Sequence, residues 1–257
     1  MARSVGGDWI GLSMRELSRG DVDVWLCVPE DMPEGPELDR CEELLDPAER
    51  ARSARFHFDR HRNRFLVSHA LVRTSLSRYA SVPPGSWRFR EVGRGRPEVA
   101  TPAGSESLRF NLSHTDRLAA CGVARVHDVG VDVEAAFRVT RHLKVAERFF
   151  SRREAAELRS LPESRQVDRF LDYWTLKESY IKARGLGLGL PLDGFTFILS
   201  EGEPRIEFER DLEDTAERWQ FHLASPTANH RLAVALCAER LEVRTAFANP
   251  LRPHDQP

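Results

Sequence analysis

The stretch YWTLKESYIKARGLGLGLPL, residues 173–192, begins with a helical pattern and ends in a loop marked by glycines. Glu178 and Lys182 stand four residues apart, so on a helix they project from one face about one turn (~6 Å) from each other. The glycines within residues 185–189 end the helix, and Pro191 prevents it from resuming. An ordinary surface helix with a Glu–Lys pair gives the same pattern. A second stretch makes a functional site the better interpretation.

This second stretch, Gly130-Val131-Asp132-Val133-Glu134, has the period of a β-strand, so its two acids point to one side, about 6–7 Å apart. Acids beside an apolar core are costly unless a cation neutralises them. A strand end that emerges into solvent is the simple alternative. Together with Glu178, however, the two acids form an oxygen-only ligand set suited to Mg²⁺ or Mn²⁺. The two stretches together predict a metal site.

The composition indicates a soluble globular protein: 41% of the 257 residues are hydrophobic, 30% are charged, and the formal net charge is −2. This charge argues against bulk binding to nucleic acid or to an anionic membrane. The first residues lack the apolar run of a signal peptide, and no segment is long enough to span a bilayer. The four cysteines are scattered without CxxC spacing, so we expect reduced thiols in a cytoplasmic protein.

Local patterns predict strands and helices along the chain. Asp46 and Pro47 have the N-cap and first-turn chemistry of a helix start. A helix predicted over residues 62–79 has one stripe, made of Phe65, Leu66, His69, Val72 and Leu76. Other helices are predicted at 47–58, 143–150, 152–161 and 166–184, and a loop at 30–38. Strands are predicted at 21–29, 87–92, 108–113, 118–124, 130–134, 195–199, 205–209, 219–224 and 232–237.

The second half of the sequence echoes the first. NRFLVSHALVR (63–73) resembles DRFLDYWTLKE (168–178), and DRLAACGVAR (116–125) resembles HRLAVALCAER (230–240). Chance can produce parts of such a match, but the order of the predicted elements repeats as well. We therefore expect an α+β fold, a pseudo-dimer of two similar halves at residues 1–127 and 128–257. The cleft between the halves is the expected place for the active site.

Positive charge gathers between Arg50 and Arg64, where six arginines accompany one acid, giving +5. A solvated helix face is the ordinary meaning of such a run. The functional alternative is a phosphate-binding surface, because guanidinium groups match phosphate oxygens. The basic turn RGRP (94–97) and the strand end NLSHT (111–115) fit this reading. The chain has no GxxxxGK[ST] loop, so an ordinary kinase or NTPase is excluded.

Acids and arginines together favour a metal-bridged polyphosphate substrate. Like charges 4 Å apart repel by about 4 kcal/mol at an effective dielectric constant near 20, and a metal between acid and phosphate reverses that sign. The pattern suits nucleophilic attack at phosphorus. A nucleic-acid-binding module is the alternative of another class, but its basic run has few interleaved aromatic residues.

Three motifs resemble, in order and spacing, the 4′-phosphopantetheinyl transferases of the surfactin-synthetase-activating (Sfp-like) type: FNLSHT (110–115), GVDVE (130–134) and the stretch 173–192. The resemblance covers roughly residues 45–240 and includes RFHFDRHRNRFLVSHALVR (55–73) and GRP (95–97). It implies a monomeric pseudo-dimer that transfers phosphopantetheine from coenzyme A to a serine of an apo carrier protein, releasing adenosine 3′,5′-bisphosphate. The carrier is acyl or peptidyl, of polyketide, nonribosomal peptide or fatty-acid synthesis. A catalytically silent carrier-binding homologue is the alternative.

The resemblance also implies roles for individual residues. Mg²⁺, or Mn²⁺ in its place, would be held by Asp132, Glu134 and Glu178. Lys182 would contact the pyrophosphate and neutralise the departing phosphate. The general base would be Glu178 first and Glu134 second, directly or through a water molecule.

The coenzyme A contacts that the resemblance implies are more numerous. The 3′-phosphate end would be bound by Arg52, Arg64, Ser113 and His114, with Arg96 supporting that side. Lys177 is counted among the coenzyme A contacts as well. Glu49 is a departure, because relatives often carry a base at this position, and it leaves the 3′-phosphate ligands open.

Overall fold

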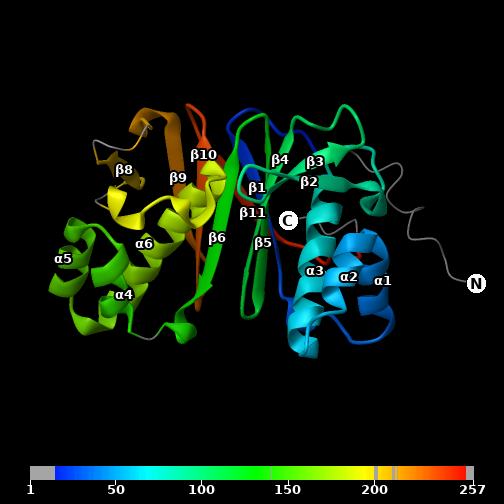
Figure 1. Cartoon of the computed structure of the whole chain (residues 1–257), viewed down its shortest axis with the longest axis horizontal. Coiled ribbons are helices and arrows are strands. Elements are labelled where there is room, and N and C mark those ends of the chain that lie inside the picture. The colour runs from blue at the N-terminus through cyan, green and yellow to red at the C-terminus, as the bar shows by residue number, and fades with distance from the viewer. Residues whose placement is uncertain (1–14, 140, 200–201, 210–211, 213, 253–257) are drawn as a thin grey trace, which may run out of the picture.

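The computed structural model describes residues 15–139, 141–199, 202–209, 212 and 214–252. Figure 1 shows the helices at the two ends of the long axis, with the sheets between them. The first half contains β1 (Asp21–Cys27), α1 (Pro36–Leu44), α2 (Pro47–Ser53), α3 (Asp59–Leu76), β2 (Arg88–Val92), β3 (Arg96–Thr101), β4 (Leu108–Thr115) and β5 (Leu118–Arg125). The second contains β6 (Val129–Ala135), α4 (His142–Phe149), α5 (Arg152–Ser160), α6 (Glu163–Arg184), β7 (Phe195–Ile198), β8 (Arg205–Phe208), β9 (Trp219–Thr227) and β10 (His230–Cys237).

The two halves share one topology, which confirms the expected α+β pseudo-dimer. The first sheet contains the order β1-β5-β4, and the second has the matching order β6-β10-β9. Each half adds a separate hairpin, β2–β3 or β7–β8, and one long helix, α3 or α6. The similar sequence segments therefore fall on equivalent elements, α3 with α6 and β5 with β10.

The last strand corrects the predicted division of the chain. β11 (Glu242–Phe247) pairs in parallel with β1, from Asp21 opposite Glu242 to Leu26 opposite Phe247. Residues 242–247 were assigned to the second half, and that part of the assignment is wrong. Their pairing partner lies more than 200 residues earlier in the chain, so no local pattern could reveal it.

Helix starts follow the local chemistry. Asp46 caps α2 in a capping box with Glu49, and Pro47 occupies the first turn, as predicted. Helix α1 begins inside the segment 30–38 that was expected to be a loop and continues to Leu44, where no element was predicted; it buries Leu38, Cys41 and Leu44. The acid-rich composition of this short helix concealed its apolar stripe.

Each half has its own core, and a third cluster joins the two sheets. Alternate residues of the strands divide between these cores, because successive side chains of a strand point to opposite faces. The cluster between the sheets consists of Val22, Val24, Leu26, Leu118, Ala120, Ala124, Val129, Val131, Val133, Leu232, Val234 and Leu236. All twelve are buried, so the halves are held together by a dry apolar contact and not by polar surface alone.

The four cysteines are free, with Cys27, Cys41 and Cys121 buried and Cys237 half-buried. Burial raises the pKa of Cys41 and of Cys121 to about 12, so these thiols stay protonated near neutral pH. Among the described residues, no helix has the length and apolarity that crossing a membrane requires.

Candidate active site at the junction of the two halves

The site begins with a close contact between α6 and β6. A Cβ atom at Gly130 would lie 1.9 Å from the backbone oxygen of Ser179 and 2.5 Å from the nitrogen of Ala183. Only glycine allows this approach. Gly130, Asp132 and Glu134 share one face of β6, so the glycine brings the helix down onto the two acids.

Lys182 of α6 is fixed over this face. Its Nζ atom donates to Asp132 Oδ1 at 2.7 Å, to Ser113 Oγ at 2.9 Å and to the backbone oxygen of Val131 at 3.1 Å. Two turns earlier in the helix, Trp174 lies near enough to Glu134 to lower the pKa of that carboxyl group. Glu178 lies between these two positions in sequence, and Coulombic interactions with Asp132 and Lys182 act on it. The helix thus presents Trp174, Glu178 and Lys182 along the acidic face of β6.

The three carboxyl groups are crowded. Burial and the charge of Asp132 raise the pKa of Glu134 to about 7, although Lys182 and hydrogen bonds lower it. Burial, followed by the charge of Asp132, raises the pKa of Glu178 as well. Both shifts mean that the negative charges destabilise one another here. A further cation would relieve them.

The donor chemistry fits a divalent cation. Asp132 Oδ2 is buried without a hydrogen-bond partner, which leaves one carboxylate oxygen available as a ligand. Carboxylate oxygens are the ligands that Mg²⁺ and Mn²⁺ prefer. In the part of the chain that the structure describes, however, no set of three acids, histidines or cysteines closes around a single point. Lys182 pairs with the other oxygen of Asp132, Oδ1. Its ammonium group therefore partly neutralises this acid, as a bound metal ion would.

The motif NLSHT builds the joint between the halves. β4 and β6 are edge strands of their sheets, and side chains of β4 satisfy the free backbone of β6. Asn111 Oδ1 accepts a hydrogen bond from the Val131 N–H at 2.9 Å, and Ser113 Oγ accepts one from the Val133 N–H at 3.3 Å. These contacts fix the register of β4 against the strand that carries the acids.

The hydroxyl of Ser113 is hydrogen-bonded within the acidic cluster. Its hydroxyl donates to Asp132 Oδ1 at 3.0 Å and accepts from Lys182 and from the Val133 N–H. A hydroxyl has one donor and two acceptor positions, and all are in use. In this structure the hydroxyl is therefore used within the acidic cluster, and the contact of Ser113 with a 3′-phosphate stays a prediction.

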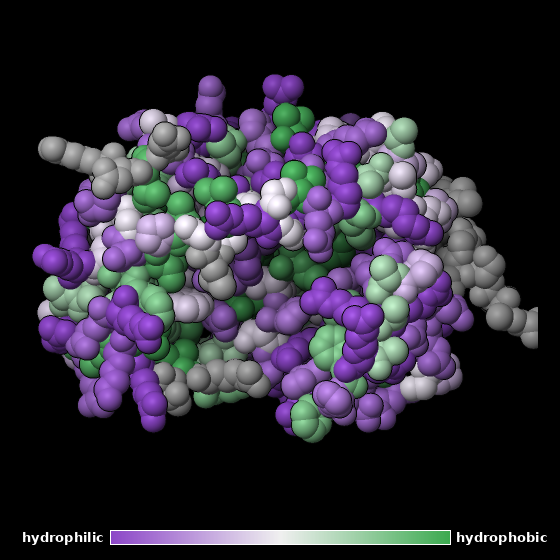
Figure 2. Space-filling view, viewed as in Figure 1, coloured by the Kyte–Doolittle hydropathy of each residue, from purple (hydrophilic) through white to green (hydrophobic). Residues whose placement is uncertain are grey.

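Two adjoining hollows form a groove along this junction, and Figure 2 shows the depression between the halves. The first has a volume of about 230 Å³ and includes Glu178, Lys182 and the glycine loop after α6 in its wall. The second has a volume of about 350 Å³ and includes Arg52 and His69. The two share four lining residues, Gly95, Pro97, Asn111 and Leu112.

The arginines expected at the phosphate end divide into three environments. Arg52 lines the second hollow, with its guanidinium carbon 5.4 Å from the ring centre of Phe65. Arg64 pairs with Asp116 at 2.7 Å and lines neither hollow, so the structure does not bring it to the groove. Arg96 lines the first hollow but is held by Glu98, by Asp128 and by the backbone oxygen of Ala183. It therefore fastens the basic turn to the end of α6.

His114, at the end of β4, remains close to cationic groups. Desolvation and the charge of Arg64 lower its pKa, and the charges of Lys182 and His69 act in the same direction. These interactions place His114 in the cationic environment between α3 and α6. It is compatible with the expected role beside a phosphate.

Lys177 is a buried residue of the second half. Its side chain has no exposed surface, and its ammonium group donates to Glu154 at 2.8 Å and to the backbone oxygens of Leu192 and Phe195 at 2.7 Å. All three N–H groups are used inside the second core, so Lys177 has no donor left for the expected contact with coenzyme A. Lys177 instead ties α6 to α5 and to the loop that follows α6.

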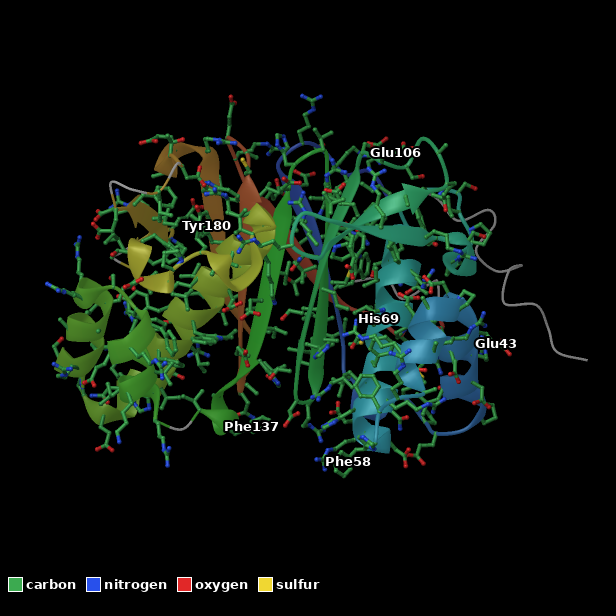
Figure 3. The ribbon with its side chains drawn as sticks, in the orientation of Figure 1. Glu43, Phe58, His69, Glu106, Phe137 and Tyr180 are labelled. Carbon is green, nitrogen blue, oxygen red and sulfur yellow. The ribbon has the colours of Figure 1, made fainter. Side chains whose placement is uncertain are left out.

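Three residues of the groove were named in the sequence analysis but were not assigned as site residues. Asn111 lines both hollows, and His69 and Glu49 line the second. His69 Nδ1 lies 2.8 Å from Glu49 Oε1, and Figure 3 shows His69 where α3 lies against α2. A histidine on the apolar stripe of a helix was the available signal, but its partner on another helix was not visible in sequence.

Comparisons with known proteins match both halves. A family model described as "4'-phosphopantetheinyl transferase superfamily" matches residues 128–237, and one described as "4'-phosphopantetheinyl transferase, N-terminal" matches residues 31–125. The chain is 36% identical to the 4'-phosphopantetheinyl transferase HetI of Nostoc sp. over 86% of this chain and 89% of that protein. It is 32% identical to the 4'-phosphopantetheinyl transferase Sfp of Bacillus subtilis over 66% of this chain and 74% of that protein.

Among solved structures, the holo-[acyl-carrier-protein] synthase of Thermotoga maritima aligns with 44% of this chain and 64% of its own, with a TM-score of 0.38 and 24% identity. The assignment does not depend on this partial likeness. It depends on the two family models and on a relative aligned along most of both chains. The chain belongs to the 4'-phosphopantetheinyl transferase family.

Proposed function

We propose that this protein transfers the 4′-phosphopantetheine group of coenzyme A to a serine hydroxyl of an apo carrier protein and releases adenosine 3′,5′-bisphosphate. One observation carries the proposal beyond family membership. The groove joins a hollow that contains Lys182 and Glu178 to a hollow that contains Arg52 and His69. A substrate with a phosphate at each of two separate points matches this division.

Coenzyme A lies along the groove in this proposal. Its pyrophosphate occupies the first hollow beside Lys182, whose ammonium group is partly exposed. Its 3′-phosphate lies toward Arg52 and His114. Arg52 has no ion pair with any described acid, so its charge is available to a ligand. Arg64, neutralised by Asp116, is a weaker candidate than the sequence suggested.

Asp132, Glu134 and Glu178 are the residues that would hold Mg²⁺ or Mn²⁺. The unpartnered Oδ2 atom of Asp132 and the raised pKa of Glu134 and of Glu178 support this assignment. When bound, the cation supplies charge neutralisation for pyrophosphate oxygens.

In the reaction, the serine oxygen attacks the phosphorus that carries the pantetheine arm. The bond from this phosphorus to the bridging oxygen breaks, and the electron pair leaves with adenosine 3′,5′-bisphosphate. The serine proton passes to a carboxylate, for which Glu178 is our first assignment and Glu134 the second. Lys182 stabilises the negative charge that develops on the pyrophosphate.

Both halves of the groove belong to one chain, so we propose that a monomer acts, and that it acts in the cytoplasm. The partner is an acyl or a peptidyl carrier protein. A catalytically silent homologue is not favoured, because the three acids and Lys182 lie together where α6 meets β6.

The test is incubation with coenzyme A, Mg²⁺ and a panel of apo acyl and peptidyl carrier proteins, followed by mass spectrometry. At least one carrier should gain the mass of one phosphopantetheine group on its serine. If carriers bind the protein but none gains mass, the silent homologue is the correct reading and the catalytic proposal fails.

A further inference from the structure

His69, Glu49 and Arg73 form a linked cluster beside the second hollow. His69 Nδ1 lies 2.8 Å from Glu49 Oε1, and Glu49 Oε2 accepts a hydrogen bond from Arg73. Arg73 also pairs with Asp46 at 3.4 Å and has no exposed side-chain surface. The Glu49 carboxylate therefore does not approach the hollow as a free negative charge. Its two oxygens are turned toward His69 and Arg73.

The side chains linked to His69 carry a net negative charge. Asp46 and Glu49 contribute two negative charges, and Arg73 contributes one positive charge. Burial raises the pKa of Glu49, but the hydrogen bond from His69 and the charge of Arg73 outweigh this effect and bring the pKa to about 2. The Glu49 side chain is therefore ionised at neutral pH. Other ionisable groups in this region are Arg52, Arg90 and Glu91, which line the same hollow, and His114.

The geometry leaves the second ring nitrogen for a ligand. Nδ1 is used by Glu49, and no partner for Nε2 is found in the described part of the chain. The imidazole stacks on Phe65 with ring centres 3.9 Å apart, while Arg52 lies 5.4 Å from the same ring. Arg52 and His69 both line the second hollow. Phe65 thus lies against both potential phosphate donors.

We propose that His69, positioned by Glu49, is a second anchor for the 3′-phosphate of the nucleotide and sets the preference of this protein for a 3′-phosphorylated substrate. This inference rests on the proposed function and deepens it. Glu49 stands where a direct cationic contact was expected. In this proposal Glu49 does not contact the 3′-phosphate; it holds His69, which makes the contact.

The experiment compares two ligands that differ only in the 3′-phosphate. Calorimetry gives the affinities of adenosine 3′,5′-bisphosphate and adenosine 5′-monophosphate for the unmodified protein and for His69→Ala, His69→Arg and Glu49→Gln. His57→Ala is the matched control, because His57 is exposed and lines neither hollow. In parallel, kcat/KM is measured with coenzyme A and with dephospho-coenzyme A.

His69→Ala should weaken binding of the 3′,5′-bisphosphate about tenfold, the range of one charged hydrogen bond, and change binding of the monophosphate at most about twofold. The same split should appear between coenzyme A and dephospho-coenzyme A. His69→Arg should retain the preference, because a guanidinium group can also donate hydrogen bonds to a phosphate. Glu49→Gln should reduce the preference, because the imidazole loses the carboxylate that positions it.

Two results would overturn the inference. Equal losses for both ligands in His69→Ala would mean that the residue only supports the hollow. A stronger preference in Glu49→Gln would mean that the carboxylate repels the phosphate instead of positioning His69. The binding arm does not require turnover, so failure of phosphopantetheine transfer by the unmodified protein would contradict the proposed function separately.

Discussion

The two halves have the same topology but place different residues at equivalent points of their first strands. Trp25 of β1 pairs with Cys121, and Gly130 of β6 pairs with Ala235, where Cys121 and Ala235 correspond in the matching segments. By the same correspondence, Cys27 of β1 stands where β6 has Asp132. The first half thus has a large aromatic residue and a thiol where the second has a glycine and an acid.

This difference explains why the acidic end of the groove is found in one half. Trp25 is buried in the core between β1 and α3, so that helix is held away from its strand. Gly130 lets α6 contact its strand directly and brings Glu178 and Lys182 over the acids. The first half instead contributes the hollow that contains Arg52 and His69, and the side chains of β4 that bond to β6. The two halves therefore share a fold but contribute different side chains to the groove.

The largest effect is expected from Glu178, which lies where the halves differ most. Glu178→Gln keeps the size of the side chain but removes its charge and its ability to accept a proton. We expect kcat to fall by about 10²–10⁴, the usual contribution of a general base, with little change in the melting temperature. Steady-state kinetics with coenzyme A checks this. Turnover at the unmodified rate would remove Glu178 from the reaction.

Substitutions at the buried pair Lys177–Glu154 test whether Lys177 stabilises the fold and does not contact coenzyme A. Lys177→Met should destabilise the fold by about 3–5 kcal/mol, because Glu154 is left as an uncompensated buried charge. The double variant Lys177→Met with Glu154→Gln should recover part of that loss. Denaturant unfolding measures both. A rise in KM for coenzyme A without loss of stability would restore the original assignment of Lys177 as a ligand contact.

Gly130→Ala tests the close approach of α6 to β6. The added Cβ would meet backbone atoms that cannot move aside cheaply, so we expect a loss of about 1–3 kcal/mol together with a lower kcat. Gly85→Ala is the matched control, because its Cβ would have an ordinary 4.0 Å contact. Thermal unfolding of the two variants gives the comparison. Equal stability of both would show that the approach does not position the helix.

The smallest loss of stability is expected at the contact between β4 and β6. Asn111→Ala leaves the Val131 N–H without its partner and should cost about 1–3 kcal/mol, near the lower end because the groove admits water. Hydrogen exchange at the Val131 amide should accelerate at the same time. An unchanged exchange rate would mean that Asn111 does not satisfy this edge of β6.

The sequence allowed the prediction of those features that have a local signature. The alternating acids of β6, the cap at Asp46 and the helix that ends in glycines were all readable from residue spacing. The duplication was readable because α3 and α6 keep the same short segment. These signals arise within one element or from its copy.

The remainder depends on contacts between distant elements. β11 finds its place only through β1, and Lys177 is buried only because Glu154 of another helix meets it. Ser113 looked like a phosphate ligand, whereas its three partners come from β6 and α6. In each case the sequence shows only that a polar side chain is present. It does not show whether the hydrogen-bond partner of that side chain is a ligand or another part of the protein.

The most direct test of the central claim, that acids of the second half and Lys182 form a metal-dependent transfer site, is transfer to an apo carrier protein in the presence and absence of a divalent cation. Excess EDTA should abolish the mass gain of the carrier, and added Mg²⁺ should restore it. Asp132→Asn should show little gain even with Mg²⁺, because it lacks the charge on the acid that holds Lys182. Undiminished transfer in excess EDTA would contradict the claim.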